Sequence, residues 1–479
     1  MNQTTKKELT EQQKVQQIYH LIGDRGFYVN TNFDIFTQET EKITLAGGTG
    51  FSVELASEGS QAYTSPLLFA ALTSLMNHGT MLITGAPGIG KTTGAEYAGH
   101  FFNGTHLNEI QAATIQGHPQ QKEENMTGYY ELAKLITGVK EVLTSRFLDC
   151  PVKIMDEINR NPPDLLSIVM KLVDSGKAVY GGKLLIGEKG PLFATANYGD
   201  EGNFALTAPF LDRFDVAVMV TSPPAYDLSA IRQRGDEKLN GNGLEEKLKV
   251  PSELKLNFSE IREQINHLPE RKNNETEFGE AENFADFLYA TLRFSECASN
   301  SLARATKGNA WQVNQEQASA GHFNDHSGLY TVNELTIRTV KAMMRYAKAY
   351  SWFIGKDEFG LEELKIVLPY LLWHKVVPSG KALAENQVWA NDRIGLITSL
   401  IDKIQTEYSE IMSLDVMKTY QVALGVLRRS DSLPFNKVRN VTVNSIKKIG
   451  NVDKPYALVM VQHLASLYNS SVSKIAMQK

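Results

Sequence analysis

The segment MLITGAPGIGKTTGAEYA, residues 81–98, restricts the fold of this chain more than any other stretch. Its apolar start predicts a short buried strand, the turn that follows fits the pattern GxxxxGK(S/T), and a helix is expected after the turn. Small residues let successive backbone N–H groups converge on an anion, and the helix directs the positive end of its dipole at the same point. The turn therefore predicts a nucleoside phosphate site, formed by Gly85, Ala86, Pro87, Gly88, Ile89, Gly90, Lys91, Thr92 and Thr93.

Two side chains of this turn carry specific expectations. Lys91 is expected to reach the β- and γ-phosphates, and the Thr92 hydroxyl to bind Mg²⁺. A chance glycine-rich turn is the alternative interpretation, and the strand–turn–helix context argues against it. The turn alone does not distinguish a kinase, a GTPase or a motor, and it does not distinguish ATP from GTP.

A second apolar run, VKIMDEINR at residues 152–160, contains two adjacent carboxylates. Parallel strands present their carboxyl ends to ligand, so Asp156 and Glu157 are predicted to lie beside the glycine turn. Asp156 is expected to hold Mg²⁺ through its water shell. Glu157 is expected to orient and polarise the water that attacks the γ-phosphate. The alternative is that these two carboxylates belong to a solvent-exposed turn that caps a helix. The glycine turn earlier in the chain argues against this alternative.

Two further polar residues complete a predicted hydrolysis site. Asn197 follows the apolar run PLFATA, where its amide is expected to hold the attacking water or contact the γ-phosphate. Arg213, in APFLDRFD, lies beside an apolar helix end, and a guanidinium from a neighbouring subunit would neutralise the charge that develops during phosphoryl transfer. The alternatives are a turn residue for Asn197 and an ion pair with Asp212 or Asp215 for Arg213.

The order of apolar runs predicts the architecture. Strands alternate with helices up to Pro224, which is typical of a mainly parallel sheet covered by helices on both faces, and the rest of the chain is largely helical. We expect an α/β P-loop NTPase core, then two largely helical regions. The predicted regions are an N-terminal extension at 1–60, the nucleotide-binding core at 61–224, a helical region at 225–395 and a C-terminal helical region at 396–479.

Composition excludes several classes of protein. The chain has 479 residues, of which 42% are hydrophobic and 22% charged, a globular profile without a run long enough to span a membrane. The N-terminal stretch lacks the apolar core of a secretory signal, and the two cysteines, Cys150 and Cys297, form no metal-binding pattern. A reducing cytoplasm is therefore the expected compartment. The net charge of −5 argues against broad nucleic-acid binding, although a local basic patch stays open.

With these motifs the chain resembles the AAA+ ATPases, and within them the MoxR group. The shared stretches are GAPGIGKTT, DEINRNPPDLLSIVMKLVDSG, ATANYGDEGNFALTAPFLDRFD and LTIRTVKAMMRYAKAY, and the similarity covers about residues 62–378. The resemblance implies an AAA+ core with ATP and Mg²⁺ as ligands, followed by an α-helical lid with insertions at 225–395 and a helical C-terminal extension. The resemblance further implies a ring, commonly hexameric, with nucleotide between neighbouring subunits. It also implies a chaperone that remodels, activates or assembles a client protein, often with a von Willebrand factor A-domain partner.

The resemblance assigns roles to seven residues: the first nucleotide motif (Lys91, Thr92), the second (Asp156, Glu157), the polar sensor (Asn197), the trans-acting arginine finger (Arg213) and the second sensor (Arg338). Arg338 would touch the γ-phosphate and couple hydrolysis to lid movement, and an ordinary helix-surface arginine is its alternative. Arg160 is a further candidate for the contact between subunits.

Two segments and the chain end carry no firm assignment. Residues 110–140 lie where this group of ATPases has an insertion in its second core helix, and residues 181–190 resemble the family's hairpin before the first sensor. Either segment could contact a client or simply be a solvated turn. The lid stretches 272–283 and 304–328 look enlarged, and residues after about 395 have no counterpart.

Other functions stay open. ATANYGD is also similar to the CbbQ/NorQ-like and CobS-like ATPases, which activate or metallate particular enzymes. McrB-type and minichromosome-maintenance motors share this layout and act on nucleic acid. The negative net charge of this chain gives little support to such a function. A nucleotide-binding assembly without hydrolysis is a third class, and the presence of Glu157, Asn197 and Arg213 together argues against it.

Overall fold

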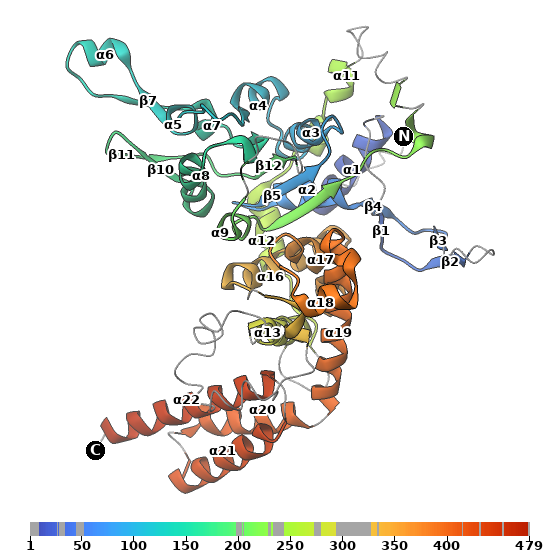
Figure 1. Ribbon diagram of the computed structural model, residues 1–479, viewed down its shortest axis with the longest axis vertical. Helices are drawn as coiled ribbons and strands as arrows, with labels where there is room; N and C mark the ends of the chain where they lie inside the picture. The colour runs from blue at the N-terminus through green and yellow to red at the C-terminus, as the bar shows by residue number, and fades with distance from the viewer. Residues whose placement is uncertain are drawn as a thin grey trace, which may run out of the picture. The chain divides into compact units, whose positions relative to one another are not determined.

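The computed structural model divides into two compact units, and each is described by itself (Figure 1). Unit 1 contains Met1–Leu268 and Lys348–Asp357, and unit 2 contains Pro269–Ala347 and Glu358–Lys479. The sequence predicts four regions, and the two compact units do not test these boundaries, so the four regions stay a prediction. The structure describes residues 9–25, 27, 34–44, 52–197, 204, 206–228, 231–232, 244–272, 279–293, 327–332, 335–413, 415–430, 433–452 and 455–477. None of the helices in these ranges has the length and apolar character needed to cross a membrane.

A five-stranded parallel sheet forms the centre of unit 1 (Figure 1). Its strands are β5 (Thr80–Gly85), β6 (Ile115–Gln116), β9 (Lys153–Asp156), β12 (Leu192–Ala196) and β13 (Val216–Val220). They lie in the order β13-β5-β12-β9-β6, so β5, the first of them in the chain, has a later strand on each side. The connection that leaves β5 leads to β6 on one side of the sheet, and the connection that leaves β12 leads to β13 on the other, so the strand order reverses between β5 and β12.

The central strands are apolar on both faces because helices cover the sheet. All five residues of β12 are buried, as are the first five of β5. The helix α2 (Ser65–Leu75) contacts β5 and β13, whereas α3 (Lys91–Asn103) contacts β5, β9 and β12. These contacts confirm the predicted α/β core with a parallel sheet flanked by helices.

The other helices of unit 1 begin and end at conventional signals. Thr10 and Gln13 form a capping box at the start of α1, and left-handed glycines, Gly104 and Gly176, end α3 and α8. Their bounds are α1 (Glu11–Asp24), α4 (Leu107–Ala113), α8 (Pro163–Ser175), α9 (Ala208–Leu211), α11 (Leu244–Leu248) and α12 (Phe258–His267). Short 3-10 turns lie at Ile158–Arg160, Ala225–Asp227 and Ser252–Leu254.

Among the described residues of unit 1, four antiparallel strand pairs lie outside the central sheet. The strands are β1 (Asp34–Phe36) with β4 (Ala62–Thr64), β2 (Thr40–Thr44) with β3 (Ser52–Ala56), β7 (Gly128–Tyr130) with β8 (Val142–Thr144), and β10 (Lys177–Tyr180) with β11 (Lys183–Ile186). Residues 110–140, where the insertion is expected, contain β6, α5 (Glu123–Met126), β7 and α6 (Leu132–Ile136), and α7 (Arg146–Asp149) follows β8. The expected hairpin at 181–190 begins earlier, with Gly181 and Gly182 at its turn.

The aromatic side chains of Tyr19, Tyr63 and Phe353 pack together in unit 1 and join α1 to β4. The Tyr19 hydroxyl accepts a hydrogen bond from the Thr64 backbone N–H at 2.6 Å, and Tyr19 is 5% exposed. Burial raises the pKa of this phenol.

Replacing Tyr19 with Phe is expected to lower the free energy of unfolding of unit 1 by about 1–3 kcal/mol, because the buried N–H of Thr64 loses its acceptor. Urea denaturation followed by circular dichroism measures the change. Tyr129→Phe is the matched control, since Tyr129 is 50% exposed. Equal stability of Tyr19→Phe and Tyr129→Phe would contradict the expectation.

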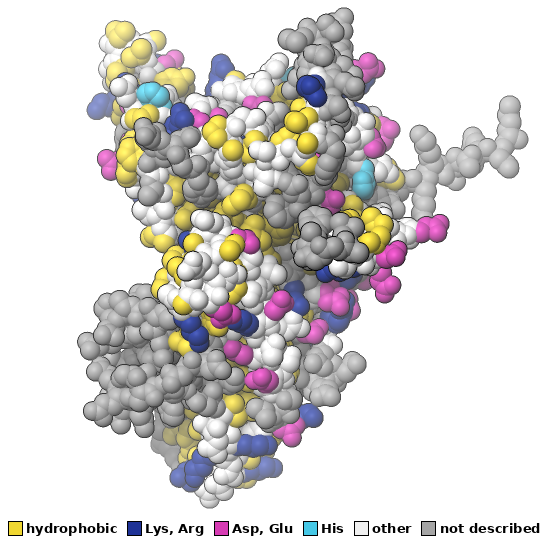
Figure 2. Space-filling model, turned by 45° about the vertical axis from the view of Figure 1, so that its right-hand side comes forward, with side chains coloured by type: hydrophobic (Ala, Val, Ile, Leu, Met, Phe, Trp, Pro, Cys, Tyr) yellow, Lys and Arg dark blue, Asp and Glu magenta, His cyan; other side chains and the backbone are white. Residues whose placement is uncertain are grey.

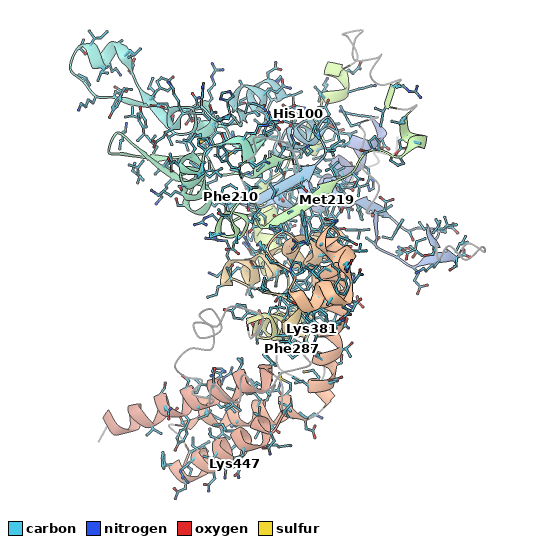
Figure 3. All side chains as sticks on the ribbon, in the orientation of Figure 1. His100, Phe210, Met219, Phe287, Lys381 and Lys447 are labelled. Atoms are coloured by element: carbon cyan, nitrogen blue, oxygen red, sulfur yellow. The ribbon has the colours of Figure 1, made fainter. Side chains whose placement is uncertain are left out.

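Unit 2 is helical, and α16 passes from it into unit 1 at Lys348. The helix bounds are α13 (Glu280–Arg293), α16 (Ile337–Phe353), α17 (Leu361–Leu372), α18 (Gly380–Glu385), α19 (Arg393–Ser413), α20 (Val416–Arg428), α21 (Phe435–Gly450) and α22 (Pro455–Met477), with 3-10 turns at Ser327–Tyr330 and Gln387–Ala390. Phe287 of α13, labelled in Figure 3, packs against the rings of Tyr408 and Tyr456. The predicted helical part is confirmed, and most of the enlarged stretch at 304–328 lies outside the described residues.

Candidate nucleotide site

The predicted site residues of the core meet at the carboxyl edge of the central sheet. The glycine turn follows β5, Asp156 ends β9, and Asn197 comes directly after β12. β5 lies between β12 and β13, and open parallel sheets bind ligands outside the carboxyl ends of their strands, where the strand order reverses. Three segments that are distant in sequence therefore form one edge.

Three glycines shape the turn. Gly85, Gly88 and Gly90 have φ angles of 151°, 75° and 81°, a range that other residues rarely adopt. A Cβ at Gly85 would lie 2.3 Å from the carbonyl oxygen of Val220. The helix α3 begins directly after the turn, and the first N–H groups of a helix have no partner within it. Of the other residues predicted to form the phosphate site, Ala86 and Pro87 are exposed, and Ile89, Thr92 and Thr93 are half-buried.

Lys91 holds the turn from within. It is 8% exposed, and its Nζ donates to the carbonyl oxygens of Gly85 at 3.0 Å and Ala86 at 2.6 Å. The same nitrogen donates to Asn197 Oδ1 at 2.6 Å. The buried ammonium group of Lys91 lies beside the backbone N–H groups of the glycine turn. It can bind an anion in place of these neutral carbonyl and amide acceptors.

Oxygen ligands suited to a divalent cation meet at Asp156. The Thr92 hydroxyl donates to Asp156 Oδ1, and the Thr195 hydroxyl donates to the same oxygen at 2.6 Å. Mg²⁺ prefers hard oxygen ligands and keeps several of its waters, so it needs only one or two protein groups beside the phosphates. Thr92 and Asp156 therefore fit a magnesium ion at this point.

Glu157 is held in a strained backbone conformation. Its φ is 49° and its ψ is 49°, the left-handed region that is uncommon for a residue with a side chain. Its backbone N–H donates to the Thr195 hydroxyl at 2.9 Å. The carboxylate accepts from Asn197 Nδ2 at 2.9 Å and from Gln116 Nε2 at 3.2 Å, and it lies 3.1 Å from Arg160 Nη1. These contacts hold the carboxylate beside the turn.

Asn197 connects the cation of the turn to the carboxylate of β9. It is 3% exposed, it contacts Lys91 through Oδ1 and Glu157 through Nδ2, and its backbone carbonyl accepts from Asn159 Nδ2 at 2.7 Å. The sequence predicted no role for Gln116, Asn159 or Thr195. The signal for Thr195 was present, because Thr195 is two residues before Asn197, and side chains two residues apart in an extended segment point to the same side.

A close backbone approach fixes Glu157 from the side of β6. The Gly117 N–H donates to the carbonyl of Asp156 at 2.7 Å, and a Cβ on Gly117 would lie only 2.0 Å from the carbonyl oxygen of Glu157. Gly117→Ala is expected to cost about 1–3 kcal/mol of folding free energy and to slow phosphate release, because the backbone of Glu157 must move. Thermal melting and a phosphate assay measure both effects.

The control for this change is Gly23→Ala, a helical position where a Cβ meets no atom within 4 Å. That variant is expected to be neutral or slightly stabilised. If Gly117→Ala kept the melting temperature and the phosphate release of the unchanged chain, the backbone contact would not position Glu157.

Arg213 lies at the opposite edge of the sheet. Its carbonyl accepts from the hydroxyl of Thr80, the first residue of β5, at 2.9 Å. β5 has six residues, so its ends are about 16 Å apart. The half-exposed side chain donates to the carbonyl of Pro209, one turn earlier in the chain. The structure therefore does not bring Arg213 to the Lys91 of its own chain.

Arg338 belongs to the other unit. It is the second residue of α16, it lies in the part of that helix assigned to unit 2, and its side chain is half-exposed. The predicted site residues are thus distributed over a single cluster in unit 1, the amino edge of the same sheet and the first turn of α16.

Comparisons with known proteins agree with this geometry. Residues 80–214 match the AAA domain of the dynein-related subfamily. A solved structure described as "a putative ATPase" from Cytophaga hutchinsonii has 18% sequence identity and a TM-score of 0.53, and the match covers 82% of this chain and 94% of that one. At this identity the likeness shows the fold alone. No curated protein matches the chain. Residues 80–214 are therefore similar to the AAA domain of the dynein-related subfamily, and the chain has an AAA+ fold.

Proposed function

We propose that the chain is an ATPase that hydrolyses ATP to ADP and phosphate with Mg²⁺. The observation that carries the proposal is the row of contacts from Lys91 through Asn197 to Glu157, directly behind the glycine turn. Phosphoryl transfer needs charge compensation and a positioned water more than covalent chemistry, and this row supplies a buried cation, an amide and a carboxylate. The AAA domain supports the same class of activity.

Each group has a distinct role in this proposal. The turn and Lys91 bind the β- and γ-phosphates, and Thr92 and Asp156 hold Mg²⁺, which neutralises phosphate charge. Glu157 takes a proton from the attacking water. Asn197 already donates to Glu157 through its amide, so it sets the direction in which the carboxylate points.

The proposed ring explains the position of Arg213. Since its side chain is half-exposed and lies at the far edge of its own sheet, it is suited to reach the nucleotide of a neighbouring copy. In the proposed hexameric ring each site then joins Lys91 of one subunit to Arg213 of the next. Arg338 at the start of α16 would sense the γ-phosphate from the lid.

The proposed biological role is a cytoplasmic MoxR-like chaperone that acts on a protein client. Its support is apolar surface on two hairpins of unit 1: Leu132 and Ile136 of α6 are 73% and 86% exposed, and Val179 and Ile186 of the β10–β11 pair are 59% and 67% exposed. The rings of Tyr130 and Tyr180 lie 5.4 Å apart, so the two hairpins are neighbours. A von Willebrand factor A-domain partner, and an enzyme-activating role of the CbbQ/NorQ or CobS type, remain proposals from resemblance.

Mg·ATP is expected to stabilise the chain against heat, because a ligand that binds only the folded state at about 100 times its Kd adds about 2.7 kcal/mol. Differential scanning fluorimetry with ATP, GTP or neither, and with Mg²⁺ or a chelator, measures this shift. Phosphate release from the same samples tests hydrolysis. A chain that ATP does not stabilise, or that releases phosphate equally well when the metal is chelated, would contradict the proposal.

A further inference from the structure

Charge is distributed very unevenly along the chain. Residues 416–479 contain ten Lys and Arg and only two Asp, a net charge of +8, so the other 415 residues carry −13. Within the described parts of α20, α21 and α22 there is no Asp or Glu. The net charge of −5, on which the expectation against nucleic acid rested, therefore averages two parts of opposite sign.

The helices α20, α21 and α22 pack against one another as a bundle within unit 2 (Figure 1). The buried face of α21 consists of Val438, Thr442, Ser445 and Ile449. At about 100° per residue, the opposite face carries five exposed side chains, which we call the α21 stripe: Lys437, Asn440, Asn444, Lys447 and Lys448. Figure 2 shows dark blue side chains at the bottom of the view, where the bundle lies. Figure 3 labels Lys447 on α21.

The order of side chains along the stripe matches the surface of duplex DNA. Lys437 and Lys447 are ten residues apart, which is about 15 Å along a helix, and the major groove of B-DNA is about 12 Å wide. Lysines at the two ends can therefore contact phosphates on the two sides of the groove. Asn440 and Asn444 lie between them, and amide side chains both donate to and accept from base edges.

We propose that the C-terminal bundle binds duplex DNA, with the α21 stripe in the major groove. Exposed Arg439 of α21, and exposed Arg428 and Arg429 at the end of α20, add positive charge to the same bundle. Phosphate contacts by Lys and Arg supply affinity, and the acidic remainder of the chain limits binding to this surface. The inference goes beyond the proposed ATPase and does not depend on it, because every residue that it uses lies within residues 416–450 of unit 2.

A membrane surface fits the stripe less well. A helix that lies in a lipid interface needs an apolar face directed at the acyl chains. In α21, Val438 and Ile449 are buried in the bundle, Val441, Val443 and Ile446 are half-buried, and Phe435 at the helix start is the exposed apolar residue. The stripe itself contains only Lys and Asn. An anionic vesicle is therefore an alternative outcome of the test rather than part of the proposal.

Fluorescence anisotropy with the full chain and a labelled duplex of about 20 base pairs, two helical turns, tests the proposal. We expect saturable binding whose affinity falls about 10²-fold between about 50 and 200 mM salt, as four phosphate contacts require. The variant Lys437→Glu with Lys447→Glu and Lys448→Glu is expected to bind at least about tenfold more weakly. Its phosphate release in the absence of DNA stays equal to that of the unchanged chain.

The matched control reverses three exposed lysines of unit 1, Lys171→Glu with Lys177→Glu and Lys189→Glu, and so changes the total charge by the same amount. It is expected to bind within about threefold of the unchanged chain. Circular dichroism confirms that both variants are folded. Failure of the unchanged chain to bind at low salt, an equal loss in the control, tighter binding of single-stranded DNA, or stripe-dependent binding to phosphatidylserine vesicles alone would overturn the proposal.

Discussion

Replacing Glu157 with Gln is expected to lower the rate of ATP hydrolysis by about 10²–10⁴-fold while the Kd for nucleotide changes little. The carboxylate is the group that takes the proton of the attacking water, and an amide of the same shape cannot take it. The glycine turn, Lys91, Thr92 and Asp156 bind the phosphates and the metal, and the substitution leaves them in place. Phosphate release gives the rate, and fluorescence titration with a labelled ATP analogue gives the affinity.

Glu109→Gln is the matched control for this prediction, because Glu109 is an exposed carboxylate on α4. It is expected to hydrolyse ATP at the rate of the unchanged chain. If Glu157→Gln also kept that rate, Glu157 would not be the base, and its strained backbone and its bond to Asn197 would need another explanation. Because this variant is expected to hold ATP, it is also suited to capture client proteins for identification.

Replacing Arg213 with Ala is expected to lower the rate of hydrolysis by about 10³-fold or more, the effect of removing an arginine finger. The isolated subunit is expected to bind nucleotide normally, since Arg213 lies at the amino edge of the sheet and Lys91 at the carboxyl edge. Arg213→Lys is expected to restore little activity, because an ammonium lacks the planar fork of a guanidinium. Phosphate release and nucleotide titration separate the two effects.

Arg146→Ala is the control, because Arg146 is exposed and belongs to α7 rather than to the sheet edge. It should leave hydrolysis unchanged. Weaker nucleotide binding by an isolated Arg213→Ala subunit would show that the arginine supports its own fold or site, and the proposed contact between subunits would then be lost.

The elements around the glycine turn could be predicted because their signals are local. An apolar run, a turn with three glycines and a helix start lie within residues 80–103, and β5 and α3 form there. The same holds for β9, β12 and β13, which are short apolar runs bounded by turn residues. The order of these strands could not be read from such signals, since it depends on which helices cover which face of the sheet.

The site itself could be predicted in part. Lys91, Thr92, Asp156 and Asn197 meet as expected because strand ends collect at one edge of a parallel sheet. The contact of Gln116 with Glu157 could not be predicted, because it depends on β6, a strand of two residues, pairing with β9. The left-handed backbone of Glu157 likewise has no sequence signal, since Gly117 permits it from a distant segment.

The most direct test of the shared site is phosphate release from mixed subunits. Lys91→Ala and Arg213→Ala subunits are inactive alone in this account, but in an equal mixture about one quarter of the interfaces join an intact lysine site to an intact arginine. We therefore expect the mixture to recover about one quarter of the activity of the unchanged ring if its sites act independently. A mixture that stays as inactive as its two components, under conditions where the subunits assemble together, would contradict a site formed between neighbouring subunits.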